Sequence, residues 1–393
     1  AAALRGRGIP AEAIEVPGAS ALATGRSLLA RGHCNPTYYL AGALVEQLRV
    51  RMAPDRNVAY LTAGSCGPCR YATYPASYRR ALATAGFGDV AVAVLDQLAP
   101  RTTQALAEIG VPVTARLLAA LARAIVLGDV LVKLGCTRRP TVTEPAAVDA
   151  LIAKARSEFE DALAHGSAVM PVIGAFAEKL AALPTRSGPP PVRVRLVGEF
   201  FASTTDGHGS YEIVRWLERQ GALVTPPAVT EWLLYLAWQA AREARGETPP
   251  FGNYQQRDAT RGEGLARALR AFFQRTARAA GVTVHLPDMD DLGTLAAPHY
   301  SPALRGGAGH LELGALLEAD RDGTADLVVS IKPFGCLPSS AVSDGVATVV
   351  ARRTRCAFVA IETTGDGEAQ VHSRLELALE MARARRASSS SPR

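Results

Sequence analysis

Apolar residues along this chain alternate between short continuous runs and longer amphipathic stretches. Short apolar runs are typical of strands buried on both faces, whereas apolar residues spaced three and four apart are typical of helices. The runs at 57–62 and 89–95 predict two buried strands, and the segment 71–82 between them predicts a helix. A strand-helix-strand unit of this kind favours a parallel sheet covered by helices.

Helical periodicity dominates the rest of the first half. Leu40, Leu44 and Leu48 lie on one face of a helix predicted over 37–52. The stretch 111–135 is apolar on nearly all sides, which predicts a buried helix. Two further helices are predicted over 143–165 and 167–183.

The alternation of strands and helices returns after a break at Ser187-Gly188-Pro189-Pro190-Pro191, which we interpret as a domain boundary. Strands are predicted over 192–199, 222–225, 325–331 and 357–362, with a further short strand suggested at 282–284. Helices are predicted over 210–220, 231–245, 262–280, 311–318, 340–352 and 370–386.

Because each half alternates strands and helices, we expect an α/β fold of two doubly wound lobes, Rossmann- or flavodoxin-like. The sheets should be mostly parallel and the site should lie between the lobes. The N-terminal α/β lobe is expected over 31–187 and the C-terminal α/β lobe over 192–387. Residues 1–30 are expected to be a linker or a leading helix, and the low-complexity tail at 388–393 is expected to be disordered.

Cysteines follow the predicted strands at the edge where such sheets form sites. Cys66 and Cys69, in Ser65-Cys66-Gly67-Pro68-Cys69-Arg70, lie between a strand and a helix, and Cys336 follows the strand at 325–331. Ligands of parallel sheets bind at the carboxyl ends of strands, so we expect these thiols to lie there. Free amides at a helix start favour negative charge, which stabilises thiolates for metal binding or for attack on disulfides.

Two more cysteines stand in short loops, Cys34 in Gly32-His33-Cys34-Asn35-Pro36 and Cys136 in Gly135-Cys136-Thr137. Iron–sulfur clusters are held by cysteine thiolates. The predicted cluster ligands are therefore Cys34, Cys66, Cys69, Cys136 and Cys336. Cys356 opens an apolar strand and is expected to be a small buried hydrophobe. A buried free thiol is the alternative for each ligand candidate.

The Cys66-Gly67-Pro68-Cys69 pair also fits two other chemistries. Its place between a strand and a helix suggests thioredoxin-like disulfide exchange, although no Trp precedes the pair and the chain is several times too long for that fold alone. Four of the thiols could instead hold a structural zinc ion, although the Cys-x2-Cys spacing occurs only once.

Three polar residues are candidate catalytic groups. His33 adjoins Cys34 and could ligate or donate a proton, or could simply be solvated. Glu199 ends a strand and could act as an acid or base, or pair with an arginine. Ser339 opens a helix, where we expect it to be an N-cap; contact with a ligand is the alternative.

Composition narrows the class of protein. The net charge of +6 over 393 residues is dispersed, which argues against nucleic acid as a partner. Six cysteines in so long a chain do not make a disulfide scaffold, and no signal peptide is recognisable, so a reducing cytoplasm is expected. The most apolar stretch, 117–134, is interrupted by Arg123 and Asp129, which favours a buried helix over a membrane span. There is no Walker loop, so ATP hydrolysis is expected only on a partner or on another part of the polypeptide.

An ordered set of motifs over residues of about 30 to 380 resembles the 2-hydroxyacyl-CoA dehydratase and double-cubane cluster protein superfamily. More narrowly, the chain resembles the dehydratase-like part carried at the C-terminal end of large proteins fused to an ATP-dependent activase. The matching motifs are Gly32-His33-Cys34-Asn35-Pro36, Gly67-Pro68-Cys69-Arg70-Tyr71, Gly198-Glu199-Phe200-Phe201, Leu217-Glu218-Arg219-Gln220-Gly221, Glu231-Trp232, Pro333-Phe334-Gly335-Cys336-Leu337-Pro338-Ser339 and Ile361-Glu362-Thr363-Thr364-Gly365-Asp366-Gly367.

The resemblance implies lobes built on parallel sheets with iron–sulfur clusters between them. It implies an activase homodimer, separate or fused upstream, that hydrolyses ATP and donates a low-potential electron. In the dehydratases a [4Fe-4S] cluster held by three cysteines leaves one iron open to a substrate oxygen, which transfers best to Cys34, Cys66 or Cys69, and Cys336. Double-cubane proteins need more thiolates, and five or six cysteines match that number better than three do.

Two departures from the family limit what the resemblance implies. Arg139-Pro140-Thr141-Val142 stands where the family has an Arg-Pro-Tyr-Glu-like segment, and no motif identifies a CoA pocket. We therefore expect an oxygen-sensitive reductase component that receives electrons from the activase and reduces a small substrate at a [4Fe-4S] or double-cubane [8Fe-9S] cluster. It is expected to act as a homodimer or heterodimer without a membrane. The alternatives are a 2-hydroxyacyl-CoA dehydratase subunit, which is a lyase, and a dithiol redox protein or inert scaffold.

Overall fold

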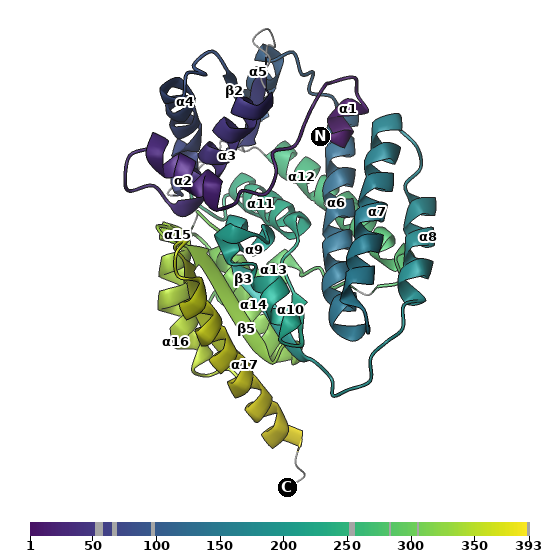
Figure 1. Cartoon of the computed structure of the whole chain (residues 1–393). Coiled ribbons are helices and arrows are strands. Elements are labelled where there is room, and N and C mark those ends of the chain that lie inside the picture. The colour runs from purple at the N-terminus through teal and green to yellow at the C-terminus, as the bar shows by residue number, and fades with distance from the viewer. Residues whose placement is uncertain are drawn as a thin grey trace.

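The computed structural model describes residues 1–51, 58–64, 69–95, 99–250, 256–282, 284–304 and 306–390. Within these residues the chain has an α/β fold that contains two parallel sheets and many helices (Figure 1). A smaller sheet lies among the N-terminal helices, and a larger sheet lies beside the C-terminal helix. A group of long helices forms the third part of the fold. The predicted α/β class is therefore confirmed.

The smaller sheet pairs β1 (Ala59–Ala63) with β2 (Ala91–Leu95) in parallel, which confirms the two strands predicted in this region. Between them run η1 (Arg70–Thr73) and α4 (Tyr74–Thr84), as the strand-helix-strand pattern indicated. The core of this region is built from apolar side chains of α3 and α4, including Leu44, Val45, Tyr78 and Leu82.

Two further helices precede this sheet. These are α2 (Ala19–Leu28) and α3 (Asn35–Arg51), so the segment 1–30 contains a leading helix and not only a linker. The two helices pack with their backbones in contact, since a Cβ atom on Gly25 would overlap the carbonyl of Tyr38. This packing fixes the start of α3, and therefore Cys34, against the rest of the fold.

The larger sheet has the strand order β4-β3-β5-β6 with every neighbour parallel. Its strands are β3 (Val192–Gly198), β4 (Ala222–Thr225), β5 (Leu327–Pro333) and β6 (Ala357–Thr363). The chain leaves β3 in one direction to form β4 and returns to the other side of β3 to form β5. The loops that follow β3 and β5 therefore diverge, and such a reversal of strand order leaves a crevice at the carboxyl ends of the strands.

Helices cover both faces of the larger sheet. On one face, α10 (Ile213–Arg219) and α17 (Glu368–Ser390) pack through residues such as Leu217 and Leu375. On the other face, α14 (Gly309–Asp322), η4 (Ser340–Ala347) and α16 (Thr348–Ala351) pack through residues such as Leu316. Every residue of β5 is buried, including Ser330 and Lys332, which is typical of a central strand covered on both faces.

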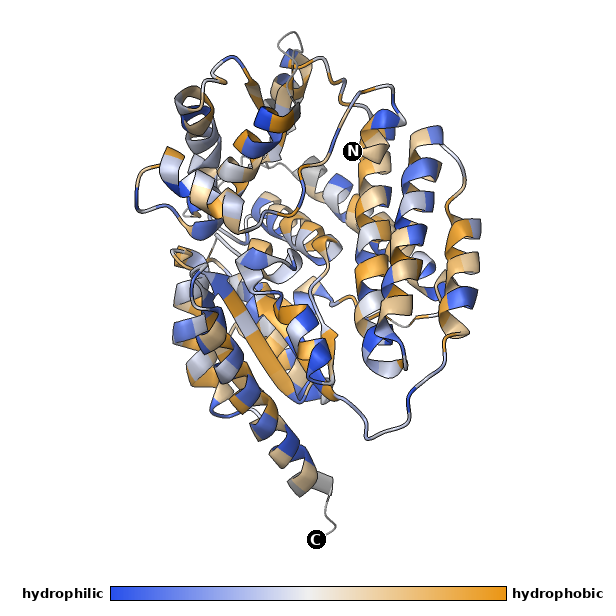
Figure 2. Cartoon of the chain, viewed as in Figure 1, coloured by the Kyte–Doolittle hydropathy of each residue, from blue (hydrophilic) through white to orange (hydrophobic). Residues whose placement is uncertain are grey.

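The third part of the fold is helical. Its helices are α6 (Ala115–Arg138), α7 (Pro145–His165), α8 (Met170–Ala181), α11 (Val229–Ala244) and α12 (Gln256–Ala279). Leu127, Phe159, Leu234 and Phe273 all belong to one apolar core. Figure 2 shows many hydrophobic residues along the length of α6. This core spans the break at 187–191, so the helices of the two predicted lobes are joined through it.

A buried polar network fastens α6 to the start of α11. Asp129 accepts hydrogen bonds from the backbone N–H groups of Val229 (2.9 Å) and Thr230 (2.8 Å). Lys133 donates to Glu231 at 3.1 Å and to the carbonyl of Pro226 at 2.6 Å. These charged side chains interrupt the apolar run of α6, and no described helix is long and apolar enough to cross a membrane.

The remaining elements are short or lie at the edges of the fold. They are α1 (Ala2–Arg5), α5 (Ala99–Glu108), η2 (Arg139–Thr141), α9 (Phe200–Thr204), η3 (His208–Ser210), α13 (Met289–Ala296) and α15 (Leu337–Ser339).

Three sequence-based expectations differ from the structure. The helix expected from Ser210 begins only at Ile213, because Tyr211 and Glu212 adopt left-handed backbone angles (φ 55° and 47°). Val282 and Val284 belong to no strand, and Thr283 lies outside the described residues. The last helix continues to Ser390, beyond its predicted end at residue 386. Residues 391–393 lie outside the described residues.

Candidate functional site

Three of the predicted thiols come together where the strand order of the larger sheet reverses. Cys336 follows β5, Cys34 precedes α3, and Cys69 precedes η1. The loop after β5 passes directly over Cys34, since a Cβ atom on Gly335 would lie 3.1 Å from the Cα atom of Cys34. The backbone of Gly335 has φ +81°, so glycine is required there for both its conformation and its small size.

Hydrogen bonds fix these segments to one another. The backbone N–H of Asn35 donates to the carbonyl of Phe334 at 3.1 Å, and the Asn35 side chain donates to the carbonyl of Thr363 at 3.2 Å. The guanidinium of Arg70 donates to the carbonyl of Gly32 at 2.6 Å. The start of α3, the start of η1 and the loop carrying Cys336 are therefore held as one unit, although that loop lies more than 260 residues after η1 in the sequence.

Cys69 and Cys336 are affected by the same neighbouring groups. Burial raises the pKa of Cys69, and the nearby Glu199 and Cys34 raise it further. Burial, together with Glu199 and Cys69, raises the pKa of Cys336 to about 12, against the opposing effect of hydrogen bonds from Ser339. Ionising several of these groups together is unfavourable unless a positive charge is present. A bound metal centre would supply that charge.

Four helix starts point at this space. Cys69 is the N-cap of η1, which runs on into α4, and Cys336 is the N-cap of α15, which runs on into η4 and α16. Cys34 directly precedes α3, and Glu199 is the N-cap of α9, where its carboxylate accepts from Ala202 N–H at 3.0 Å. Unpaired amides at helix starts favour negative charge, so this arrangement suits thiolates and an anionic group held by them.

A tyrosine contacts the sulfur of Cys34. The Tyr74 hydroxyl oxygen lies 2.9 Å from the Cys34 Sγ atom, and the Thr37 Oγ1 atom lies 3.6 Å from it. Burial, with Cys34 and Glu199 nearby, raises the pKa of Tyr74 well above its usual value. The hydroxyl therefore stays protonated and donates to the sulfur once Cys34 is ionised. The ring of Tyr71 packs edge-on against Tyr74, with 4.7 Å between centroids.

Glu199 is held between β3 and β5 at the side of the thiols. Its backbone N–H donates to the carbonyl of Ile331 at 2.8 Å. This approach requires Gly198, because a Cβ atom there would overlap the same carbonyl. Burial raises the pKa of Glu199, opposed by the backbone N–H groups of Ala202 and Phe201. No described residue forms an ion pair with Glu199, so the alternative of pairing with arginine is not seen among the residues of this structure.

The other two candidate catalytic residues flank the thiols. His33 is half-buried, its ring lies edge-on to Tyr38, and burial together with Arg70 and Arg80 lowers its pKa, so the ring is neutral near pH 7. Ser339 is buried beside Cys336, where its hydrogen bonds favour the thiolate.

The remaining cysteines divide into three cases. Cys136 is not brought to this group; it lies on α6 with its Sγ atom 3.6 Å from an Arg139 nitrogen and lines a separate cavity. Cys356 is buried in the core on the α14 side of the larger sheet, which confirms it as a small hydrophobe. Cys66 lies outside the described residues, as do Ser65, Gly67 and Pro68.

The thiols of the site are donors of a kind that iron–sulfur clusters use. Among the residues that the structure describes, no three or more His, Cys, Asp or Glu side chains are grouped closely enough to hold a metal ion. Cys34 is buried, Cys69 and Cys336 are partly exposed, and thiolates of this kind have the softness and charge that an iron–sulfur cluster requires. The chemistry of Cys34, Cys69 and Cys336 therefore fits such a cluster.

Sequence reasoning missed several contributors to the site, above all Tyr74 and Asn35. Tyr71, Tyr74 and Tyr78 follow Cys69 at helical spacing, a signal that could have placed tyrosines on the face of α4 nearest the thiols. The role of Asn35 depends on contacts across the fold and leaves no local pattern. Comparison with known proteins assigns no family: no protein-family model matches the chain, and the search of curated proteins finds no significant match.

Proposed function

We propose that this chain is the iron–sulfur reductase component of an ATP-driven two-component system, of the 2-hydroxyacyl-CoA dehydratase and double-cubane cluster protein superfamily. One observation carries the proposal. Cys34, Cys69 and Cys336 come from three distant segments and meet at the strand-order reversal, enclosed by four helix starts. The proposal includes two doubly wound lobes, with the smaller and larger sheets as their centres and the cluster between them.

The three thiols, with Cys66 as a candidate fourth ligand, would hold a [4Fe-4S] or [8Fe-9S] cluster. When bound, the cluster would supply low-potential electrons to a small substrate. The chain's own residues orient and protect this chemistry. Tyr74 donates to the Cys34 sulfur and Ser339 supports Cys336. Hydrogen bonds to the thiolate sulfurs and burial tune the reduction potential of such a cluster.

Glu199 is the proton-holding group of the proposed site. Its pKa is raised by burial, so its carboxyl can carry a proton closer to neutral pH than an exposed glutamate can. Reduction of a small molecule usually consumes protons as well as electrons, and Glu199 lies beside Cys69 and Cys336. We assign it the transfer of a proton to the substrate.

The electron donor would be an ATP-hydrolysing activase, separate or fused upstream, in the cytoplasm. Phe334 and Leu337 flank Cys336 and are each 54% exposed, so the loop that carries this cysteine presents apolar surface to a partner. The positive charge of Arg70 lies in the same region. A homodimer or heterodimer of the chain also belongs to the proposal.

The number of thiols in the group supports a second candidate function. Three described thiols converge while Cys136 lies apart, and three cysteines are what the resemblance implies for a 2-hydroxyacyl-CoA dehydratase. In that case the chain would be a lyase subunit that eliminates water. An assay of water loss from 2-hydroxyacyl-CoA thioesters, with activase, ATP and reductant present, separates the two functions. Clear turnover there would replace the reductase assignment.

Cysteine variants test the proposed ligand set. Cys34→Ala and Cys336→Ala should each lose most of the iron of anaerobically purified protein, because each removes a thiolate ligand. Cys356→Ala is the matched control, since this buried cysteine lies in an apolar core away from the site. Equal iron loss from all three variants, or loss from none, would contradict the proposal.

A further inference from the structure

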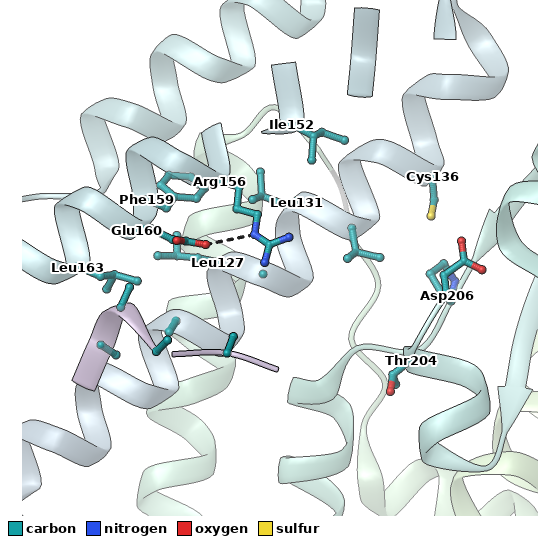
Figure 3. A pocket seen from close by; sticks show the side chains of 18 of the residues that line it. Leu127, Leu131, Cys136, Ile152, Arg156, Phe159, Glu160, Leu163, Thr204 and Asp206 are labelled. Atoms are coloured by element: carbon teal, nitrogen blue, oxygen red, sulfur yellow. Dashed lines mark hydrogen bonds and ion pairs between the residues drawn. The ribbon is translucent and has the colours of Figure 1, made fainter. Parts of the chain in front are cut away.

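A second site lies on the far side of α9 from the thiols. It is a cavity of about 750 Å³ between α6, α7 and the loop that follows α9 (Figure 3). Clefts that bind small molecules commonly have volumes of about 300–1,000 Å³. Helix α9 separates the two places, because Glu199 caps its start beside the thiols and Thr204 at its end lines the cavity. Nothing in the proposed reductase chemistry uses this cavity.

The cavity has an apolar end and a polar end. Figure 3 shows apolar side chains of α6 and α7 gathered at one end, and Cys136, Thr204 and Asp206 at the other. The apolar side chains drawn there are Leu127, Leu131, Ile152, Phe159 and Leu163. Such a division suits a ligand with a hydrocarbon body and one polar group.

The charges around the cavity decide which polar group fits. At the apolar end Glu160 is matched by Arg156 at 3.2 Å and Arg5 at 3.7 Å. At the polar end Arg139 is already held by Glu218 at 2.6 Å. The three arginines outnumber the two glutamates, but each of these charged groups already has an ion-pair partner.

Asp206 also lines the cavity, and it differs from the charged residues above because it has no ion-pair partner among the described residues. It is solvent-accessible at the polar end of the cavity. Burial raises its pKa to about 6, and the nearby Glu218 and Glu212 act in the same direction, while a hydrogen bond from the backbone N–H of Val214 and the charge of Arg215 oppose them. An added positive charge beside Asp206 would relieve both effects.

We propose that this cavity binds an amphipathic amine, with its hydrocarbon body against α6 and α7 and its ammonium group on the Asp206 carboxylate. The inference does not depend on the reductase assignment, since it uses no thiol of the proposed cluster. The ligand class follows from the apolar lining and from a carboxylate that forms no ion pair with a described residue.

Calorimetric titration of the full chain with 4-phenylbutylamine tests the proposal. We expect one saturable site per chain with a Kd below about 1 mM. The alcohol 4-phenylbutanol should bind about tenfold more weakly, because it lacks the charge that strengthens hydrogen bonds to carboxylates. Asp206→Asn should weaken amine binding by about the same factor, whereas Asp89→Asn, an exposed aspartate near β2, should not.

A glycine pair tests the location of the site. Gly128 lies on α6 and lines the cavity, and a Cβ atom built there meets nothing within 4 Å. Gly128→Leu should therefore occupy part of the cavity without disturbing α6 and weaken amine binding about tenfold or more. Gly174→Leu is the control, because Gly174 is also helical, also has open space at Cβ, and lies outside the cavity. Circular dichroism checks that both variants are folded.

Three results would overturn the proposal. They are no saturable binding of the amine, equal binding of the alcohol and the amine, and unchanged amine binding in folded Gly128→Leu. Iron content need not change in any of these variants, so failure of the amine site and failure of the proposed function are separate outcomes.

Discussion

At the scale of single residues, the contact between Tyr74 and Cys34 gives the most direct access to the site. The Tyr74 hydroxyl lies 2.9 Å from the Cys34 sulfur and stays protonated because burial raises its pKa. Hydrogen bonds to ligand sulfurs stabilise the reduced, more negative state of an iron–sulfur cluster. Tyr74 should therefore raise the reduction potential of a cluster held by Cys34.

Tyr74→Phe should lower that potential by about 60 mV, which corresponds to a tenfold change for a one-electron couple. A redox titration followed by EPR measures it. Tyr60→Phe is the control, because Tyr60 belongs to the same group of packed tyrosines but contacts Tyr78 and not Cys34. An equal shift in both variants, or none in Tyr74→Phe, would remove Tyr74 from the site.

His310 gives a prediction of pH dependence. It is 2% exposed; Tyr235 donates to its Nδ1 atom at 3.0 Å, and its Nε2–H donates to the carbonyl of Ser301 at 3.1 Å. Burial lowers its pKa to about 4, with Arg242 acting in the same direction and Ser301 opposing. In the unfolded chain the pKa is about 6.5, so the unfolded state binds the proton first as the pH falls.

Stability should therefore be complete above pH 7 and decline as the pH falls from about 6.5 towards 4. The loss from His310 between pH 7 and pH 5 should be about 2 kcal/mol in the free energy of unfolding. His310→Gln, which cannot be protonated but keeps a donor for Ser301, should reduce the pH slope by that amount. Urea unfolding at the two pH values measures it, and an unchanged slope would contradict the account.

Residue type and local setting were enough to select loop cysteines, and their role as cluster ligands stays a prediction. The segments that carry Cys34 and Cys336 lie against each other, and Cys69 is near Cys336. Cys136 had a similar setting but lies elsewhere, since its position on α6 is set by packing against the larger sheet. Tyr74 was missed because its importance comes from one contact with a residue 40 positions away.

At the scale of elements, the loop after β5 sets the position of Cys336 relative to Cys34. Gly335 has φ +81°, and a side chain there would press on the Cα atom of Cys34 at 3.1 Å. A left-handed backbone costs other residues about 1–2 kcal/mol. The steric contact with Cys34 is a separate effect, because it moves one ligand loop away from the other.

Gly335→Ala should lose about 1 kcal/mol or more of stability and also most of the bound iron. Gly323→Ala is the matched control, because Gly323 has φ +62° but nothing within 4 Å of its built Cβ atom. The control should lose similar stability and keep its iron. Thermal unfolding and iron content measure the two effects, and an unaltered iron content in Gly335→Ala would contradict the assigned role of the loop.

Elements with strong local patterns were predicted well. The segments that became β3, β5 and β6 are rich in β-branched and other apolar residues, which is typical of strands in a covered parallel sheet. Val282 and Val284 are of the same residue type but belong to no strand, since a strand also needs a neighbour to pair with. Tyr211 and Glu212 interrupt a helical pattern through backbone angles that composition does not encode.

At the scale of the whole molecule, the buried ions between α6 and α11 join the two halves of the chain. Lys133 and Glu231 are 4% and 3% exposed, and Arg195 on β3 lies 3.4 Å from the same glutamate. Removing one partner of a buried ion pair leaves an uncompensated charge, which costs about 3–5 kcal/mol.

Lys133→Met should therefore lower the free energy of unfolding by about 3 kcal/mol. Lys154→Met is the control, because Lys154 pairs with Glu158 at 3.9 Å on the exposed surface of α7 and such pairs contribute less than about 1 kcal/mol. Urea unfolding measures both. A loss from Lys133→Met no larger than that of the control would show that the network does not join the halves.

The arrangement of the elements was the part that the sequence predicted least. Local patterns show which faces are buried but not which element covers them. The break at 187–191 has every local mark of a boundary, yet Phe159 before it and Phe273 after it belong to one core. The strand order of the larger sheet likewise depends on how its helices cross, and this order is what brings the loops after β3 and β5 to the thiols.

The central claim is that the converging thiols hold an iron–sulfur cluster. The most direct test is a count of iron and acid-labile sulfide in anaerobically purified protein, with EPR after reduction by dithionite. The account predicts about four irons per chain for a single cubane or about eight for a double cubane, with matching sulfide and an EPR signal. Zinc, or no metal together with a reversible disulfide between Cys66 and Cys69, would contradict it and favour dithiol chemistry.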